Sequence, residues 1–145
     1  ENKLKIYLLG AKEGTAEKVK EILEKKYHKI QIVGTFSGSP SPEEEKEITN
    51  LIKESNANVL FVAYGAPKQE LWIARNIKKM PQVKLAIGIG GAFNFIAGIL
   101  KRAPKFMQKM GIEWLYRLFQ EPSRIKRIYN ATVKFSLKVL KSSLR

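Results

Sequence analysis

The stretch "NVLFVAYGAPKQELW", residues 58–72, joins an apolar run to a helical pattern through a short Gly-Ala-Pro turn. Residues 58–65 are almost continuously apolar, which is typical of a parallel strand that is covered on both faces. Pro67 suits the first turn of a helix, because that turn does not use its backbone N–H, and residues 67–79 continue with helical spacing. A strand that leads directly into a helix is the repeating unit of an α/β fold.

The same strand-then-helix order recurs along the first hundred residues. We expect further strands at residues 4–10, 29–36 and 83–90 and further helices at 15–26 and 42–54, with "GAFNFIAGIL", residues 91–100, after the last strand. Ser41 and an acidic first turn favour a helix start at residue 42. The pattern predicts an α/β, Rossmann-like parallel sheet with helices on both faces.

From residue 101 the pattern changes to helices without strands, expected at 104–110, 112–120 and from 122 to about 144. We therefore divide the chain into an α/β body, residues 1–100, and a C-terminal helical appendage, residues 101–145. The appendage is basic, because it holds 12 of the 27 Lys and Arg residues but only Glu113 and Glu121 of the 13 acidic residues. Anionic partners are implied.

Three roles fit a segment that is both basic and aromatic, namely binding to a nucleic acid, binding to a membrane surface and binding of phosphate groups. Aromatic residues (Trp114, Tyr116 and Phe119) and later aliphatic residues alternate with the basic ones, which suits an interfacial helix on an anionic membrane surface. No helix-turn-helix, RNP or KH signature is present, so we expect no nucleic acid partner. No apolar run is long enough for a membrane-spanning helix.

Composition excludes several kinds of chemistry. The chain has no cysteine, and all 13 acidic residues are glutamates, so disulfides, thiolate catalysis and an Asp-x-Asp metal site are excluded. The single histidine, His28, lies between an expected helix and strand, and we interpret it as a surface residue. The sequence begins without an initiator Met and without a secretory signal pattern, which indicates a cropped domain.

Glycines follow every expected strand of the body. Those that we single out as candidate ligand-binding residues are Gly10, Gly14, Gly65, Gly90 and Gly91. The turns after parallel strands lie on one edge of the sheet, where such folds bind ligands through backbone N–H groups and helix N-termini. The alternative is that these glycines only make tight turns. No Walker loop and no G-x-G-x-x-G is present, so ATP hydrolysis and NAD chemistry are unsupported.

Lys68 and Gln69 lie in the first turn of the helix that Pro67 begins. A lysine and an amide at that point could bind phosphate and sugar hydroxyl groups. The pattern is equally compatible with two solvated side chains at a helix start.

Four segments, "GAPKQELW" (65–72), "GIGGAFNFIAG" (88–98), "KRAP" (101–104) and "EWLYRLFQEPSR" (113–124), together resemble the WecG/TagA/CpsF family of bacterial glycosyltransferases. The resemblance implies transfer of N-acetylmannosamine from a UDP-sugar donor to a polyprenyl-diphosphate-linked sugar acceptor, undecaprenyl-diphosphate-linked N-acetylglucosamine. Such enzymes serve wall teichoic acid, common antigen or capsule synthesis, are inverting, and use neither metal nor other cofactor. We accordingly expect a peripheral membrane protein on the cytoplasmic, inner face of the plasma membrane; the oligomeric state stays open, a homo-oligomer included.

The resemblance also implies site residues. Arg117, Arg124 and Arg127 match arginines that hold the diphosphate, and with Gln69 they are our candidate catalytic residues. Lys68, Gln69 and Asn94 join the five glycines above as candidate donor-binding residues. Family members commonly have Asp where this chain has Asn94, and an aromatic residue near the uracil where this chain has Gly38-Ser39-Pro40.

Family members are also longer at the N-terminus, and that part carries the Asp proposed as catalytic base. The chain thus resembles the C-terminal portion of such an enzyme. Two hypotheses follow: a glycosyltransferase, or the larger part of one, and a non-catalytic, membrane-associated descendant of it.

Overall fold

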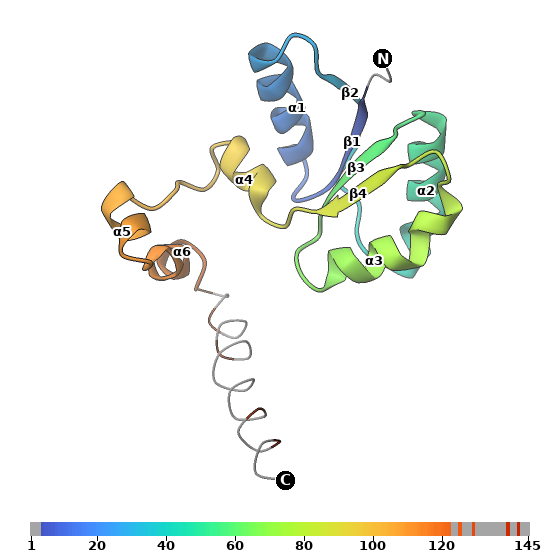
Figure 1. The fold of residues 1–145 in the computed structure, drawn as a ribbon. Helices are drawn as coiled ribbons and strands as arrows, with labels where there is room; N and C mark the ends of the chain where they lie inside the picture. Colours follow the sequence, from blue (N-terminus) through green and yellow to red (C-terminus); the bar gives the residue numbers. More distant parts are fainter. Residues whose placement is uncertain (1–3, 123–124, 126–128, 130–138, 140–141, 143–145) are drawn as a thin grey trace. The chain divides into compact units, whose positions relative to one another are not determined.

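The computed structural model describes residues 4–122 together with residues 125, 129, 139 and 142. The chain divides into two compact units, residues 1–100 and 101–145 (Figure 1). Each unit is described by itself below.

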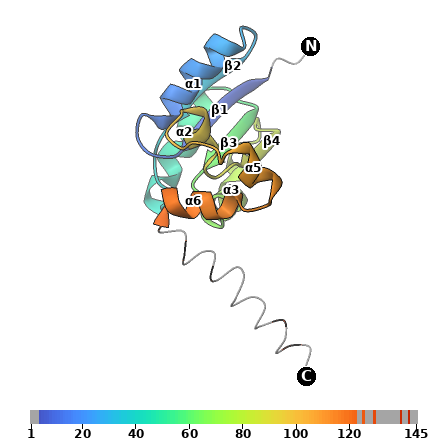
Figure 2. The ribbon, with the colours of Figure 1, turned by 90° about the vertical axis from the view of Figure 1, so that its left-hand side faces the viewer.

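The first unit is built on a four-stranded parallel sheet. Its strands are β1 (Lys5–Gly10), β2 (Gln31–Phe36), β3 (Val59–Ala63) and β4 (Leu85–Gly88), in the spatial order β2-β1-β3-β4 (Figure 1, Figure 2). All three strand pairs are parallel, and in one row of the register Ile6 pairs with Val59, which pairs with Leu85. The α/β, Rossmann-like fold that the sequence predicts is confirmed.

Helices lie on both faces of this sheet. Helix α1 (Thr15–Lys26) and the short α4 (Ala92–Ile96) lie on one face, and α2 (Glu45–Glu54) and α3 (Lys68–Asn76) lie on the other (Figure 1). Two 3₁₀ turns, η1 (Pro42–Glu44) and η2 (Ile77–Lys79), precede α2 and follow α3. Because successive strand residues point to opposite faces, β1, β2 and β3 each contribute to two cores.

One core lies between the sheet and α2 and α3, and the other between the sheet and α1 and α4. In the first, Leu60 and Val62 of β3 pack with Trp72 of α3, and all three are fully buried. In the second, Leu8 of β1 packs with Phe93 of α4. Burying a side chain of this size stabilises the fold by roughly 1.5–3 kcal/mol.

The expected helix at 42–54 begins differently from the prediction. A 3₁₀ turn occupies Pro42–Glu44, and Ser41 makes no side-chain capping bond. Instead the carboxylate of Glu44 accepts a hydrogen bond from the Ser39 backbone N–H at 2.8 Å. Glu44 thereby ties the loop after β2 to the start of the helix, whereas the sequence predicted Ser41 as the capping residue.

The prediction that the strands are covered on both faces is wrong at β4. Leu85 and Ile87 of this strand are 49% and 39% exposed. Within the described residues of the first unit, β4 ends the sheet, and the helices of that unit leave these two side chains exposed. An apolar run in the sequence is the same whether a covering element is present or not.

The second unit contains the short helix α5 (Lys105–Lys109) and α6 (Glu113–Gln120). The Gln120 side chain joins the end of α6 to the start of the unit, accepting from Lys101 N–H at 3.1 Å and donating to Lys101 O at 2.9 Å. The helix expected from residue 122 to about 144 lies mostly outside the described residues. In the part of the chain that the structure describes, no helix has both the length and the apolar character needed to span a membrane.

Candidate functional site

The turns that follow β1, β3 and β4 meet at the carboxyl edge of the sheet. The turn after β1 requires glycine at Gly10, because its φ is +95° and a Cβ would lie 2.9 Å from the Tyr64 ring. Side chains rarely tolerate that conformation, and the aromatic ring leaves no room for one. The Gly10 backbone and the Tyr64 ring therefore lie close together at the carboxyl end of β1.

Gln69 bridges the loop after β3 to the loop after β4. Its Oε1 accepts hydrogen bonds from Gly65 N–H at 3.0 Å and from Gly90 N–H at 2.9 Å. Its Nε2 donates to Glu70 Oε1 at 2.8 Å, and only 5% of the residue is exposed. Gly88 makes room for this side chain, since a Cβ there would lie 2.5 Å from Nε2. One buried amide therefore fixes the two loops relative to each other.

A cavity of about 440 Å³ opens beside this bridge, between the loop after β2 and helix α3. It is lined by Ser39, Pro40, Ser41, Lys68, Leu71 and Arg75. Lys68 is exposed at the first turn of α3 and has no ion pair among the residues that the structure describes. Both its charge and the positive end of the helix dipole favour an anion at this point.

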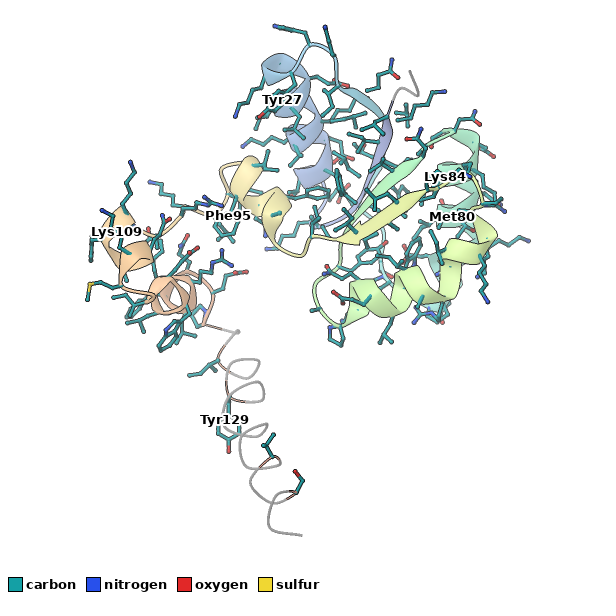
Figure 3. All side chains as sticks on the ribbon, viewed as in Figure 1. Tyr27, Met80, Lys84, Phe95, Lys109 and Tyr129 are labelled. Atoms are coloured by element: carbon teal, nitrogen blue, oxygen red, sulfur yellow. The ribbon has the colours of Figure 1, made fainter. Side chains whose placement is uncertain are left out.

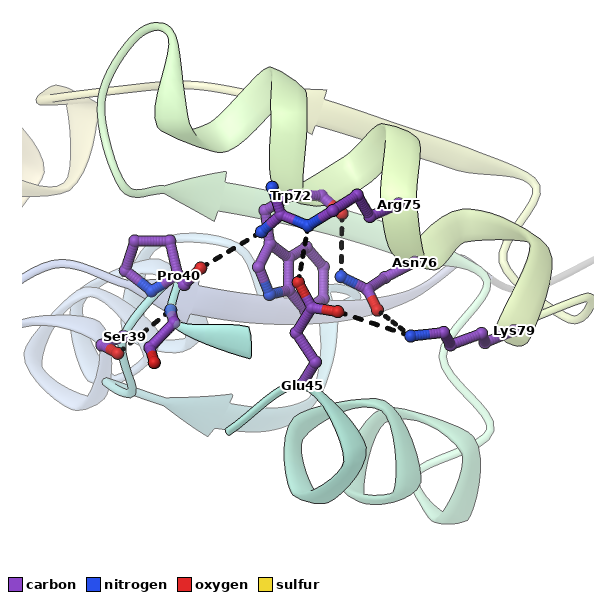
Figure 4. Close-up of polar contacts among 8 residues, drawn as sticks. Ser39, Pro40, Glu45, Trp72, Arg75, Asn76 and Lys79 are labelled. Atoms are coloured by element: carbon purple, nitrogen blue, oxygen red, sulfur yellow. Dashed lines mark hydrogen bonds and ion pairs between the residues drawn. The ribbon is translucent and has the colours of Figure 1, made fainter. Parts of the chain in front are cut away.

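Arg75 forms the far wall of the cavity and is held by an ion-pair network (Figure 4). Its Nε donates to Glu45 Oε1 at 2.7 Å and its Nη2 to Pro40 O at 3.2 Å, while Lys79 Nζ lies 3.4 Å from Glu45 Oε2. Burial opposes ionisation of Glu45, but hydrogen bonds from Arg75, Asn76 and Lys79 and the charge of Arg75 lower its pKa below the ordinary value. Glu45 is therefore an anion that holds α3 and the Pro40 loop together.

Tyr64 directly follows β3 and Trp72 lies on α3. Their rings are arranged edge-to-face, with 6.0 Å between the ring centres. Burial, with smaller effects from Glu44 and Tyr7, raises the pKa of Tyr64, so its hydroxyl stays protonated. The Tyr64 hydroxyl and Trp72 Nε1 are buried, and neither has a hydrogen-bond partner within the described ranges. Both groups can donate, but neither lines the cavity.

The structure brings some of the predicted site residues together and separates others. Gly65, Lys68, Gln69 and Gly90 belong to one cluster, and Gly10 lies at the same edge. Gly14 caps α1 with open space around it, whereas Gly91 and the half-buried Asn94 belong to the start and body of α4. The binding and catalytic roles of all these residues stay predictions.

The three predicted arginines belong to the second unit. Arg117 lies on α6, where its Nη2 is 2.9 Å from Glu113 Oε1. Arg124 and Arg127 lie outside the described residues. The interpretation of His28 as a surface residue agrees with its exposed position.

Among the lining residues, Ser41, Leu71 and Arg75 were not identified as site residues, and Ser39 and Pro40 were named only through the resemblance, as the loop where family members have an aromatic residue near the uracil. A signal for Leu71 and Arg75 was present, because Lys68, Leu71 and Arg75 are spaced i, i+3 and i+7 and so share one face of the helix. Ser41 carries no such signal, since its position depends on how the loop after β2 folds back. Within the described ranges, no group of three or more potential metal-ligating His or Glu side chains occurs.

A comparison with models of known protein families matches residues 1–145, the whole chain, to the family described as "Glycosyl transferase WecG/TagA/CpsF family". The match includes both units. The chain therefore belongs to the WecG/TagA/CpsF family of glycosyl transferases, which supports a glycosyltransferase role in the synthesis of cell-surface polymers.

Proposed function

We propose that this member of the WecG/TagA/CpsF family moves N-acetylmannosamine from UDP-N-acetylmannosamine to undecaprenyl-diphosphate-linked N-acetylglucosamine. The observation that carries the proposal is the cavity at the carboxyl edge, in which Lys68 stands at the amino end of α3 with no ion pair within the described ranges. A nucleotide diphosphate is a doubly anionic group of the kind that this position favours.

The donor would lie along the cavity with its diphosphate near Lys68. The uridine would then lie against Leu71 and the Ser39–Pro40–Ser41 loop, whose hydroxyl groups offer hydrogen bonds to the ribose and the base. Arg75 is already paired with Glu45, so we assign it to shaping the loop rather than to neutralising the diphosphate. This division gives the two cations of the cavity different roles.

The transfer itself is a direct displacement. The acceptor hydroxyl oxygen forms a bond to the anomeric carbon while the bond from that carbon to the β-phosphate oxygen breaks, and UDP leaves with the bonding electrons. The hydroxyl proton passes to a general base, and the configuration at the anomeric carbon inverts. Lys68 would stabilise the charge on departing UDP, and Arg117, Arg124 and Arg127 would hold the acceptor diphosphate, because a guanidinium can form two hydrogen bonds to phosphate oxygens. The proposal includes no metal ion.

The second unit would bind the inner face of the bacterial plasma membrane, where the lipid-linked acceptor is located. In support, four large apolar side chains of α5, α6 and the turn between them, namely Phe106, Met110, Trp114 and Phe119, are more than half exposed. Basic residues accompany them along the appendage. Apolar side chains that enter the interface and cations that attract anionic lipid act together in such segments.

The alternative function is that of a non-catalytic, membrane-associated descendant of such an enzyme that still holds UDP. The two candidates differ in turnover but not in nucleotide binding.

The deciding experiment measures UDP release from UDP-N-acetylmannosamine with and without the lipid-linked acceptor, and UDP affinity by calorimetry. Acceptor-dependent release supports the transferase. We expect Lys68→Ala to weaken UDP binding about tenfold, the loss of one charge-assisted contact, and Arg124→Ala with Arg127→Ala to reduce turnover by about 10²-fold or more. Lys53→Ala, an exposed lysine of α2, is the matched control.

UDP binding without acceptor-dependent release would identify the non-catalytic descendant. Unchanged UDP affinity in Lys68→Ala would remove the donor from this cavity. For the membrane surface, Phe119→Glu should lower co-sedimentation with vesicles that contain anionic lipid, and equal co-sedimentation of the variant would contradict the proposed interfacial role.

A further inference from the structure

Two hydrogen-bond donors are buried without an acceptor beside the carboxyl-edge cavity. The Tyr64 hydroxyl and Trp72 Nε1 are both enclosed, and neither has an acceptor among the residues that the structure describes. Trp72 is fully buried, so its indole N–H is shielded from bulk water. An unpaired buried donor is costly, and most such groups in folded proteins are paired with protein, water or a ligand. Two of them on neighbouring rings indicate a position for an acceptor from outside the chain.

Both donors lie beneath the loop that follows β2. Tyr64 and Trp72 belong to the core between the sheet and helices α2 and α3. Burial is the main cause of the raised pKa of Tyr64, and the charge of Glu44, whose carboxylate accepts from Ser39 N–H, adds to it. In Figure 4 the nitrogen edge of the Trp72 indole is turned toward Ser39 and Pro40. The loop, which lines the cavity through Ser39 and Pro40, therefore separates both donors from it.

The loop is held to α3 by an exposed contact. Arg75 Nη2 donates to Pro40 O at 3.2 Å, and this hydrogen bond is exposed to solvent. Water can replace such a bond, so a segment attached in this way opens locally at a low cost in free energy. Leu71, which lines the cavity, directly precedes Trp72. A planar ring that enters beside Leu71 and displaces Pro40 would therefore reach the indole N–H and, next to it, the Tyr64 hydroxyl.

The chemistry of the two donors selects the ring. An indole N–H can only donate a hydrogen bond, whereas a tyrosine hydroxyl can also accept one. Uracil has two carbonyl oxygens, O2 and O4, and so offers an acceptor to each donor. Cytosine keeps O2 but has an amino group in place of O4, which would leave the indole N–H facing another donor. A site in which the wrong ligand leaves buried polar groups unpaired rejects that ligand strongly.

We propose that Trp72 and Tyr64 select the base of the nucleotide: the loop after β2 moves aside, Trp72 Nε1–H donates to O4 of uracil, and the Tyr64 hydroxyl donates to O2. The assignment rests on the proposed function, because it concerns the base of the UDP that the proposed function places beside Lys68. Trp72 and Tyr64 are specificity residues in this scheme and not catalytic ones, since they contact no reacting atom.

Nucleotide affinities measured by calorimetry test the role of Tyr64. We expect the 145-residue chain to bind UDP at least about tenfold more tightly than CDP, the factor that one well-placed hydrogen bond provides. Tyr64→Phe should weaken the binding of both nucleotides about tenfold, because O2 is common to them. The melting temperature of the free variant should be equal to that of wild type or higher, because the hydroxyl that is removed has no partner within the described ranges.

Tyr27→Phe is the matched control for Tyr64→Phe. Tyr27 is 49% exposed and lies at the C-terminal end of α1 (Figure 3). We expect this variant to bind UDP and CDP as wild type does, with an unchanged melting temperature.

The sulfur analogue benzothienylalanine removes the indole N–H of Trp72 and keeps the double ring. The chain has two tryptophans, so in a Trp114→Phe background the analogue occupies position 72 alone. We expect it to reduce the preference for UDP over CDP to less than about threefold, against the same background with ordinary tryptophan. In that background the indole ¹H NMR signal of Trp72 should also shift downfield when UDP is added, because the N–H gains an acceptor.

Three results would overturn the inference. One is a Tyr64→Phe protein that binds UDP as tightly as wild type, and another is an unchanged preference for UDP in the benzothienylalanine protein. The third is a free Tyr64→Phe protein that melts well below wild type, which would show that an internal water already pairs with the hydroxyl. Failure of the proposed function has a different signature, since wild type would then bind neither nucleotide.

Discussion

The two cavities of the α/β unit lie at opposite ends of the same strands and are built differently. At the carboxyl edge, short loops are held by hydrogen bonds from Gln69 and by the Glu45–Arg75 ion pair, and Lys68 faces the space between them. At the amino end, the cavity is lined mainly by apolar side chains around the starts of β1 and β2. The first arrangement suits a small anionic ligand, whereas the second offers mainly apolar contacts.

The largest expected effect contrasts a covered strand with the uncovered one. Leu60→Ala removes a fully buried side chain and should lower the free energy of unfolding by about 2–5 kcal/mol, through lost burial and a residual cavity. Leu85→Ala makes the same change on the neighbouring strand, where half of the side chain is exposed, and should cost less than about 1 kcal/mol. Urea denaturation of both variants measures the difference. Equal costs would mean that Leu85 is covered in solution.

The next effect concerns the bridge between the carboxyl-edge loops. Gln69→Ala leaves the Gly65 and Gly90 N–H groups without their acceptor and opens space against Gly88, so we expect a loss of about 2–4 kcal/mol. The exposed neighbour Lys68 is the control, and Lys68→Ala should change stability by less than about 0.5 kcal/mol. Denaturant melts compare the two. A Gln69→Ala variant as stable as the control would show that the loops do not need the bridge.

The smallest effect depends on pH. Glu45→Gln should cost about 1 kcal/mol near neutral pH, because it weakens charge-assisted hydrogen bonds to a partly exposed Arg75. The folded protein lowers the pKa of Glu45, so its stabilising effect is present above the ordinary value of about 4.3 and is lost as pH falls through the lower folded value.

Unfolding free energies of wild type and Glu45→Gln should therefore converge as the pH falls below about 4. The control is Glu24→Gln on α1, where the ion pair with Lys20 is exposed and 4.0 Å long, and we expect this substitution to change stability near neutral pH by less than about 0.5 kcal/mol. A constant gap between wild type and Glu45→Gln at all pH values would contradict the assignment of this carboxylate.

The sequence predicted the order and type of the strands and of the described helices other than α4, because local apolar patterns and turn residues determine them; residues 91–100 were assigned no element, and α4 (Ala92–Ile96) forms there. It predicted β4 too long, at residues 83–90. In the structure the Lys84 and Leu85 N–H groups both donate to Asn58 O, and the strand pairs only from Leu85 to Gly88. The residues at which a strand begins and ends its pairing depend on the neighbouring strand. A local sequence pattern carries no information about that neighbour.

The candidate site was less predictable because its geometry depends on distant pairs. Gln69 was identified as a residue that could face a ligand, but one of its partners, Gly90, is 21 residues away. Arg75 was missed, since its role depends on Glu45, 30 residues earlier. The exposure of Leu85 could not be predicted either, because it depends on which elements pack against β4 rather than on the residues of β4.

Gln69 also has a thermodynamic consequence for any molecule that enters the carboxyl edge. Its single side-chain oxygen accepts hydrogen bonds from both loops. Without these bonds, the loops would lose conformational freedom only when a ligand bound. Because that freedom is already lost on folding, the entropic penalty of association falls mainly on the ligand. We therefore expect the two loops to have nearly the same amplitude of motion with and without a bound ligand.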